Sequence, residues 1–412
     1  MILRWPFPAL SPQPVTEPDQ IIRIAAQGDG VTADGRHAPG GVPGDMLRAN
    51  GLLERGPHHV EPPCRHYASC GGCQLQHADE QALSQFVTER VTFAARKQGI
   101  EIGELLPTHL SPQHSRRRAT LHALRAANGA VIGFREASSH RIVDLHECLV
   151  LRPELAQVLP ALRSFIASHA GKRPVDIELT LADQGVDCSL KHLPLEGLAA
   201  TEAALELAQA SGLARLSLDQ GYGAEIMWEP QPVTITLSGR PVGFPPGSFL
   251  QATQDGEDRL AADAKDWIGD ATSVADLFAG LGTFAFALAE PAKVLAAEAA
   301  RDAHLACKAA AGAAGLPIAA MHRDLFRNPL QPEELNRFEA VLLDPPRAGA
   351  KEQVGQIADS SINRVVYISC NPVSWSRDIA RLIEAGFRLE KLRPVGQFRW
   401  STHVELASYF TR

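Results

Sequence analysis

From about residue 270 onward, short apolar runs alternate with longer segments that carry apolar residues at helical spacing. The apolar runs have the length of buried strands, and they cover residues 273–280, 293–298, 317–324, 339–344 and 364–369. Helices are predicted to begin near residues 284 and 301, and again from Arg377. Strands that alternate with helices in this way predict a parallel, doubly wound α/β sheet with helices on both faces.

The earlier part of the chain follows two other patterns. Residues 21–51 place short apolar runs between turns rich in Gly, Asp and Pro, which is typical of a small β-barrel or an array of hairpins. Further on, residues 79–99 predict an amphipathic helix, and residues 116–145 predict strands joined by a hairpin turn at Asn128-Gly129. These patterns predict three domains, at residues 1–60, 61–240 and 241–412.

The composition is that of an ordinary globular protein, with 45% hydrophobic and 21% charged residues. No run of 18 apolar residues appears, and the first residues lack the apolar centre of a signal peptide. We therefore expect a monomeric, cytoplasmic protein without a membrane span.

The net charge is −7, which argues mildly against a nucleic-acid partner, but its distribution is uneven. Residues 109–125 hold four Arg and three His with no acid, and residues 363–412 hold eight basic against four acidic residues. A localised RNA-binding surface needs this asymmetry, although an ordinary solvated face has it too.

A glycine turn follows the first strand of the predicted sheet, in "DLFAGLGTF" at residues 276–284. Gly280 and Gly282 let the backbone approach a ligand closely, and the third glycine of the dinucleotide fingerprint is missing. Glu298 ends the next strand, where a carboxylate can accept hydrogen bonds from both ribose hydroxyls. Together these features predict a site for S-adenosylmethionine rather than for NAD or FAD.

Two further acids end strands at the same edge of the sheet. Asp324 ends the run at 317–324, where it is either a ligand-facing acid or a helix cap. Asp344 precedes Pro345 and Pro346, whose rings fix the backbone and remove two amide donors. A rigid turn of this kind suits a backbone that holds a flat base in one orientation.

Cys370 also follows a predicted strand, directly before Asn371-Pro372. A small buried hydrophobe is the alternative, but the strand-end position and the rigid dipeptide favour a nucleophile. Carbon-5 of uracil accepts a methyl group only after a thiolate has added to carbon-6, and a base must then remove the proton from carbon-5. Glu405, in the alternating run near the end of the chain, is the predicted base; His403 is the competing one.

Three cysteines follow the pattern C-x5-C-x2-C at Cys64, Cys70 and Cys73, with two glycines between the last two. Cys148 is the natural fourth ligand. Four thiolates hold either zinc or an iron–sulfur cluster, and four unrelated thiols are the remaining alternative. A disulfide framework is not expected from seven cysteines in a chain of this kind.

The motifs "FLQ", "DLFAGLGTF", "DPPRAG", "SCNP" and "HVE" stand in the order found in the RNA uracil-5 methyltransferase family, which this chain resembles over nearly its whole length. The resemblance implies a Rossmann-like class I methyltransferase domain, with Cys370 as nucleophile and Glu405 as base. It also implies the residues that line the cofactor and uracil site: Gln251, Phe278, Thr283, Glu298, Asp324 and Asp344.

The sequence departs from the family pattern at three positions. Thr253 stands where the family often has Asn, and Phe278 stands where some members have Tyr. Gly396, in "VGQF", replaces an Asp, and we expect this change to loosen the loop that holds the base.

The resemblance also bears on the other two domains. The family subset with this cysteine pattern binds a 4Fe–4S cluster, which implies Cys64, Cys70, Cys73 and Cys148 as its ligands, in a loop of a central α+β domain. "GGVPGD", within residues 1–60, resembles part of a shortened TRAM domain, a small OB-like β-barrel.

The implied activity is methylation of carbon-5 of a uridine in RNA, with 23S ribosomal RNA favoured over transfer RNA. A transfer-RNA uridine methyltransferase, a cytosine-5 methyltransferase and a non-catalytic RNA-binding protein on the same scaffold are the alternatives. "SCNP" is not the motif of the cytosine enzymes, and intact Cys370, Glu405 and Asp344 argue against the non-catalytic protein.

Overall fold

The computed structural model describes residues 19–127, 129–137, 139–290 and 292–412. The described chain forms two compact units. One comprises the described residues up to Pro63 together with Leu75–Phe86, and the other comprises Cys64–Gln74 and Val87–Arg412. Asn128, in the predicted hairpin turn, lies outside the described residues.

The first unit is built on one antiparallel sheet in the order β3-β2-β1-β4-β5. Its strands are β1 (Asp19–Ile24), β2 (Gly30–Thr32), β3 (His37–Ala38), β4 (Met46–Leu47) and β5 (Leu53–Glu54). Ile21, Ala38 and Leu47 form its small buried core. These short strands and glycine turns agree with the pattern of the sequence, while an OB-like barrel stays a prediction.

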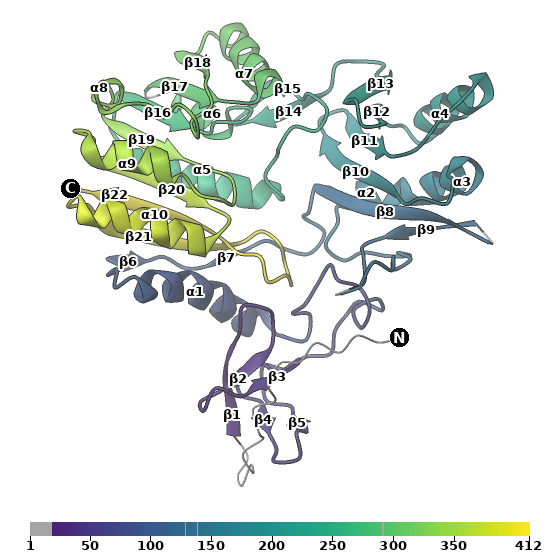
Figure 1. The fold of residues 1–412 in the computed structure, drawn as a ribbon, viewed down its shortest axis with the longest axis horizontal. Helices are drawn as coiled ribbons and strands as arrows, with labels where there is room; N and C mark the ends of the chain where they lie inside the picture. The colour runs from purple at the N-terminus through teal and green to yellow at the C-terminus, as the bar shows by residue number, and fades with distance from the viewer. Residues whose placement is uncertain (1–18, 128, 138, 291) are drawn as a thin grey trace. The chain divides into compact units, whose positions relative to one another are not determined.

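The central part of the second unit is a six-stranded sheet in the order β13-β12-β11-β10-β8-β9 (Figure 1). Its strands are β8 (Arg118–Ala126), β9 (Gly129–Gly133), β10 (Val175–Ala182), β11 (Gly185–Lys191), β12 (Arg215–Asp219) and β13 (Ala224–Trp228). The helices that accompany it are α2 (Pro153–Gln157), α3 (Leu159–His169) and α4 (Leu198–Ala210). Apolar residues of α3 and α4 share one buried core with the sheet.

The C-terminal part carries the predicted α/β sheet, in the order β18-β17-β16-β19-β20-β22-β21-β6, with β7 also paired to β21. Its strands are β6 (Glu104–Leu105), β7 (His109–Leu110), β16 (Ser273–Leu277), β17 (Lys293–Glu298), β18 (Ile318–His322), β19 (Ala340–Leu343), β20 (Arg364–Ser369), β21 (Arg388–Gly396) and β22 (Glu405–Thr411). A separate hairpin pairs β14 (Thr234–Leu237) with β15 (Arg240–Gly243).

Helices lie on both faces of this sheet (Figure 1). They are α5 (Gln254–Ile268), α6 (Thr283–Leu288), α7 (Arg301–Ala313), α8 (Pro332–Leu335), α9 (Lys351–Asp359) and α10 (Pro372–Glu384). Successive side chains of a strand point to opposite faces, so Val366 and Ile368 of β20 pack in one core with α5 and α6. Tyr367, between them, points the other way and donates its hydroxyl to Asp378 of α10 at 2.8 Å.

The sheet differs from the prediction in two ways. Strands β16 to β20 are parallel, as predicted, but β22 is antiparallel to both of its neighbours, because it returns from β21 and inserts beside β20. Strands β6 and β7 extend the sheet from residues 104–110, far outside the predicted domain at 241–412. Helix α1 (Glu80–Lys97) precedes them in the chain.

In the part of the chain that the structure describes, no helix is both long and apolar enough to cross a membrane.

Candidate active site

A cavity of about 650 Å³ opens at the carboxyl ends of β16, β17, β19 and β20. This is the edge at which open α/β sheets bind ligands, and the volume is that of a small-molecule pocket. The cavity brings together most of the site residues that the sequence predicts: Gln251, Phe278, Thr283, Glu298, Asp344, Cys370 and Glu405.

The glycine turn forms one end of the cavity. Phe278 has φ = 64°, a left-handed conformation that is uncommon for a bulky residue and marks local strain. The Glu298 carboxylate accepts hydrogen bonds from the backbone N–H of Gly280 at 2.9 Å and of Ala300 at 2.6 Å. The acid at the end of β17 therefore holds the turn after β16 in place.

The two glycines of the turn have different roles. A Cβ on Gly280 would meet no heavy atom within 4 Å, so this side of the turn faces open space in the cavity. A Cβ on Gly282 would lie 2.8 Å from Sγ of Cys307, so this glycine is needed for packing against α7.

The residues at this end fit a nucleoside cofactor. The rings of Phe278 and Phe326 lie 5.3 Å apart and both line the cavity, which offers apolar surface to a flat base. A carboxylate has about four acceptor sites, so Glu298 retains acceptor capacity for ribose hydroxyls beyond its two backbone donors. The open space over Gly280 leaves room for the rest of the molecule.

Asp324 has a different position from the other predicted acids. It is absent from the cavity lining, and its Oδ1 accepts from the backbone N–H of Phe326 at 3.0 Å and of Arg327 at 3.3 Å. These contacts hold a turn and are not a helix cap, because the next helix, α8, begins only at Pro332. By holding this turn, Asp324 places Phe326 at the cavity.

Cys370 follows β20, and the residue after it fixes the loop. The Asn371 side chain accepts from Val373 N at 3.1 Å, which caps α10, and donates to the carbonyl oxygen of Arg347 at 2.9 Å. Ser374 Oγ donates to the same carbonyl at 3.0 Å. The loop of "SCNP" is thereby tied to the loop of "DPPRAG". Helix α10 begins at Pro372, five residues before the predicted start, because proline suits the first turn of a helix.

Three acidic groups share the other end of the cavity, and each has a raised pKa. Burial raises the pKa of Cys370 to about 11, helped by the charges of Glu405 and Asp344 and opposed by Arg347. Burial raises the pKa of Asp344 well above its usual range. Burial also raises the pKa of Glu405 to about 7, while Arg118 and Gln397 oppose this shift.

Two buried glutamines connect the two carboxyl groups. Gln251 Nε2 donates to Asp344 Oδ2 at 3.2 Å, and Gln397 Nε2 donates to Gln251 Oε1 at 3.0 Å and to Glu405 Oε2. Gln397 Oε1 accepts from the backbone N–H of Thr253 at 3.2 Å. The side chain of Gln397 is only 1% exposed, so this chain of hydrogen bonds fixes Glu405 away from water.

The residues that line the cavity all lie in a region that is similar to known proteins. A family model described as tRNA (Uracil-5-)-methyltransferase matches residues 244–412. A protein of Zymomonas mobilis, named as an RNA methyltransferase, is 50% identical over 394 residues, which cover 95% of this chain and 99% of that protein. The 23S rRNA (uracil(1939)-C(5))-methyltransferase RlmD of Erwinia tasmaniensis is 30% identical, over 96% of this chain and 90% of that protein.

The chain belongs to the RNA uracil-5 methyltransferase family. The predicted family and enzyme class, an S-adenosylmethionine-dependent RNA (uracil-5-)-methyltransferase, are thereby confirmed.

The crystal structure of a Pyrococcus abyssi tRNA (uracil-54, C5)-methyltransferase in complex with S-adenosyl-L-homocysteine has a similar fold. It superposes with a TM-score of 0.74 at 21% identity, over 96% of this chain and 99% of that one. The class I methyltransferase fold is therefore confirmed as well.

Three further residues of the methyltransferase matter for the cavity and were not predicted from the sequence. Gln397 lies next to Gly396 in "VGQF", Phe326 follows Asp324 by two residues, and Arg347 belongs to "DPPRAG". A polar residue at a buried strand end was a usable signal for Gln397. No sequence signal indicated that Phe326 would meet Phe278.

His403, the competing base of the methyltransferase, is not part of the cavity lining. Its ring lies 5.8 Å from the ring of Phe398, and burial lowers its pKa. Gly396 ends β21, where a Cβ would lie 2.7 Å from Leu110 Cδ2, and the next residue, Gln397, is buried and hydrogen-bonded; a loosened loop stays a prediction.

The four predicted cysteine ligands of the methyltransferase lie in one region. Cys64 and Cys148 both act electrostatically on Cys70, and burial is the main cause of its raised pKa. Cys73 and Cys148 both act on Arg116, whose pKa burial lowers to about 10.

The glycines between the cysteines have a steric role. A Cβ on Gly71 would lie 2.7 Å from the carbonyl oxygen of Arg135, and one on Gly72 would lie 3.1 Å from the Phe134 ring. The close approach of this loop therefore needs both glycines. Among the described residues, however, no three His, Cys, Asp or Glu side chains are arranged to hold a metal ion. The donor set suits a metal centre, and the cluster itself stays a prediction.

Proposed function

We propose that this methyltransferase transfers a methyl group from S-adenosylmethionine to carbon-5 of one uridine in RNA, through a covalent adduct between Cys370 and the uracil ring. The observation that carries the proposal is that the thiol of Cys370 and the carboxyl group of Glu405 line one cavity with the glycine turn.

The proposed roles follow from where each side chain lies in the cavity. Cys370 is the nucleophile and Glu405 is the base. The residues assigned to binding the cofactor and uracil are Gln251, Phe278, Thr283, Glu298 and Asp344. Asp324 is assigned to the same site indirectly, through the turn that carries Phe326.

The proposed reaction balances without an electron donor or acceptor. The thiolate of Cys370 adds to carbon-6 of uracil, which turns the ring into an enolate with a nucleophilic carbon-5. The cofactor, when bound, would supply the methyl group that carbon-5 takes: the bond between its sulfonium sulfur and the methyl carbon breaks, and the thioether S-adenosylhomocysteine is the leaving group. Glu405 then removes the remaining proton from carbon-5, the bond between sulfur and carbon-6 breaks, and 5-methyluridine and the thiolate are released.

The environment of Glu405 supports its role as base. A general base works best when its pKa lies near the working pH, and burial brings the pKa of Glu405 to about 7. Its hydrogen bond from Gln397 also fixes the position of the carboxylate. Access to carbon-6 requires a uridine that is unstacked from its neighbours, as for other enzymes that modify bases.

The RNA substrate we favour is 23S ribosomal RNA, with transfer RNA as the alternative. The support is the 30% identity with a 23S rRNA methyltransferase over nearly the whole of both chains. The structural neighbour is a transfer-RNA enzyme, but at 21% identity. Mass mapping of 5-methyluridine in ribosomal and transfer RNA from a strain lacking this protein would test the choice. Loss of one 5-methyluridine from 23S rRNA is expected, and loss from transfer RNA would contradict it.

The proposal also includes an iron–sulfur cluster and the division of the chain into three domains. We propose that Cys64, Cys70, Cys73 and Cys148 hold a 4Fe–4S cluster, with zinc as the alternative, inside a central domain at residues 61–240. A short TRAM-like barrel at residues 1–60 would precede it, and the methyltransferase domain at 241–412 would follow. Protein purified anaerobically should absorb in the visible range and lose that absorbance in a Cys73→Ser variant, whereas zinc gives a colourless protein.

The covalent mechanism is tested by the variant Glu405→Gln. We expect it to add its thiol to uracil and to methylate carbon-5, but not to release the product, because no base removes the proton. A protein–RNA adduct should therefore accumulate in denaturing gels. Cys370→Ala is the matched control and should form no adduct while it still binds the cofactor. Normal turnover by Glu405→Gln would remove Glu405 from the mechanism.

A further inference from the structure

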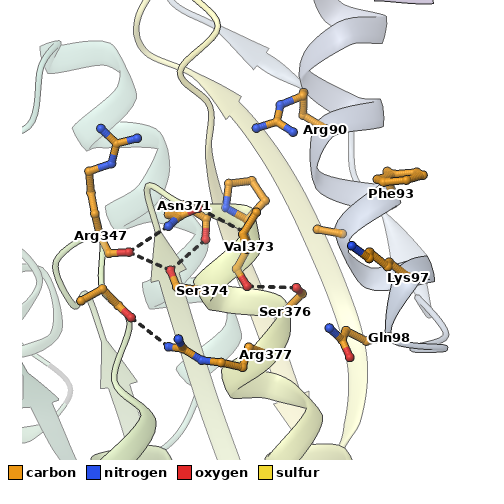
Figure 2. Close-up of a pocket in the computed structure, with 13 residues that line it drawn as sticks. Arg90, Phe93, Lys97, Gln98, Arg347, Asn371, Val373, Ser374, Ser376 and Arg377 are labelled. Carbon is orange, nitrogen blue, oxygen red and sulfur yellow. Dashed lines mark hydrogen bonds between the residues drawn. The ribbon is translucent and has the colours of Figure 1, made fainter. Parts of the chain in front are cut away.

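A second cavity, of about 420 Å³, lies between the C-terminal half of α1, the loop after β19 and the start of α10. Figure 2 shows Arg90, Phe93 and Lys97 of α1 on one side and Arg347 and Asn371 on the other. All of these residues belong to the second compact unit. We call this cavity the basic groove.

The lining of the basic groove is strongly cationic. Arg90, Lys97, Arg347 and Arg377 line it, and no Asp or Glu is among its lining residues. Such a concentration of positive charge is unusual in a chain with a net charge of −7.

The four cations differ in how far they are already engaged. Arg377 donates to the carbonyl oxygen of Ala348 at 2.8 Å and to the buried Asp378 carboxylate. Lys97 and Arg347 are exposed at the surface. Arg90 Nε is buried and has no hydrogen-bond partner among the described residues. A buried donor of this kind is costly unless a ligand satisfies it.

The groove also presents exposed apolar side chains. Phe93 is 65% exposed and Val373 is 66% exposed, which is unusual for large apolar residues so close together. An aromatic ring within a positively charged groove is the combination with which proteins bind single-stranded nucleic acids, because every base has a face that stacks.

The groove and the candidate active-site cavity share one lining residue, Arg347. Arg347 lines both cavities, and its carbonyl oxygen accepts from Asn371, the residue after Cys370. Its guanidinium also acts electrostatically on the Cys370 thiol. A ligand that occupies the groove is therefore adjacent to the target base.

We propose that the basic groove binds the single-stranded RNA segment next to the target uridine. Phosphates of that segment contact Arg90, Lys97 and Arg347, and one unstacked base lies on the ring of Phe93. The inference rests on the proposed function, since it assumes that a uridine of the same RNA enters the catalytic cavity.

The test compares Lys97→Gln with Arg96→Gln. Both changes remove one exposed positive charge from neighbouring positions of α1, but only Lys97 lines the groove. The probe is a fluorescent single-stranded oligouridine of about twelve nucleotides, within the range of sizes that single-strand sites cover. Binding is measured over a series of salt concentrations.

We expect the magnitude of the negative slope of log K against log salt concentration to decrease by about 0.7 for Lys97→Gln, and to stay unchanged for Arg96→Gln. Arg90→Gln should have the same effect as Lys97→Gln. Phe93→Ala should weaken binding about fivefold or more without changing the slope, because it removes stacking and leaves the charges. Lys97 is exposed, so Lys97→Gln should fold normally. The test therefore stands even where Arg90→Gln does not fold.

Methyl transfer from labelled cofactor to ribosomal RNA of a strain lacking the protein separates the two proposals. If the native protein methylates this RNA but Lys97→Gln and Phe93→Ala bind the oligouridine as Arg96→Gln does, the groove proposal is wrong and the proposed function stands. Failure of the native protein to bind the oligouridine would also overturn the groove proposal. Absence of methyl transfer to any RNA would overturn the proposed function.

Discussion

Cys370 is surrounded by groups that disfavour its thiolate. Burial and the carboxyl groups of Glu405 and Asp344 raise its pKa to about 11, while Arg347 and a backbone hydrogen bond act in the other direction. A thiol with such a pKa is almost wholly protonated near neutral pH, and the thiolate is the reactive form. In the free enzyme, the Cys370 thiol, the proposed nucleophile, is therefore largely unreactive.

This electrostatic restraint predicts how fast Cys370 is alkylated. Glu405→Gln removes one of the charges that raise the pKa, so the thiolate fraction should increase. At pH 8, above the pKa of Glu405, we expect iodoacetamide to modify Cys370 several-fold faster in Glu405→Gln than in the native protein. Mass spectrometry of the Cys370 peptide measures the rate, and the peptide of buried Cys188 is the internal control. Equal rates at Cys370 would show that Glu405 does not restrain the thiol.

Substitution of Gln397 is expected to change how the methyl-transfer rate depends on pH. Its hydrogen bond to Glu405 lowers the pKa of that carboxyl group, against the raising effect of burial. Gln397→Leu removes the donor, so the pKa of Glu405 should rise above about 7. Glu405, the proposed base, would then be protonated over a wider pH range, and the acid limb of the single-turnover rate should move to higher pH by about one unit.

The pH profile distinguishes this role from a structural one. Gln397 also accepts from Thr253 N, so Gln397→Leu is expected to lower the unfolding temperature as well. A loss of stability alone would lower the rate at every pH and leave the midpoint of the acid limb unchanged. That result would contradict the role of Gln397 in setting the pKa of Glu405.

At the scale of elements, the two glycines of the turn after β16 have different roles: Gly282 is needed for packing against α7, and Gly280 leaves space in the cavity. Gly282 has φ = 94° and no space for a Cβ beside Cys307, whereas Gly280 has φ = 56° and open space. We expect Gly282→Ala to lower the free energy of unfolding by about 2–4 kcal/mol, from backbone strain plus the clash.

Gly280→Ala is the matched variant of the same turn. It should cost only about 1 kcal/mol of stability, because strain is its sole penalty. Its methyl group would project into the cavity, so we expect weaker binding of S-adenosylmethionine. Chemical denaturation and calorimetric titration measure the two effects. The assignment is wrong if Gly282→Ala is the more stable of the two or if Gly280→Ala binds the cofactor normally.

Strands β16 to β20 and helices α6 and α7 could be predicted because each has a local signal. The run of β19 is wholly apolar and those of β16 and β17 are mostly apolar, and residues on both faces of these strands are buried, which is what such runs indicate. Pairing between distant segments has no such signal. Two-residue strands β6 and β7 are too short to be recognised, and only the folded chain shows that they lie along β21.

The candidate site shows the same division. Cys370, Glu298 and Asp344 could be proposed because each ends a recognisable strand at one edge of the sheet. The link between Gln251 and Gln397 could not, because it joins side chains 146 positions apart. The cysteine spacing indicated that thiols would gather, but it carries no information on how the loop orients them.

At the scale of the whole molecule, Arg117 joins the central sheet to the methyltransferase sheet. It precedes β8, is 6% exposed, and donates from Nε to the carbonyl oxygen of Gln251 at 3.1 Å. Its Nη2 donates to the buried carboxylate of Glu257 in α5 at 2.5 Å. The backbone of Gln251, a cavity residue, is therefore held in position by a cation that directly precedes a strand of the other sheet.

Removal of this cation should be costly. Arg117→Met leaves Glu257 buried without its cationic partner, and we expect a loss of about 3–5 kcal/mol in the free energy of unfolding. Arg259→Gln, which breaks the 3.8 Å contact with Asp263, should cost about 1 kcal/mol or less, since Arg259 is largely exposed. Chemical denaturation measures both. The double variant Arg117→Met, Glu257→Gln should recover part of the loss, and an unchanged midpoint for Arg117→Met would contradict the role of the pair.

The position of β22 has a consequence for synthesis of the enzyme. This strand lies between β20 and β21 and begins with Glu405, so residues 405–411 complete both the sheet and the proposed catalytic pair. A polypeptide that terminates before them lacks the proposed base and leaves the facing edges of β20 and β21 unpaired. Because unpaired strand edges promote aggregation, we expect such a truncated product to aggregate.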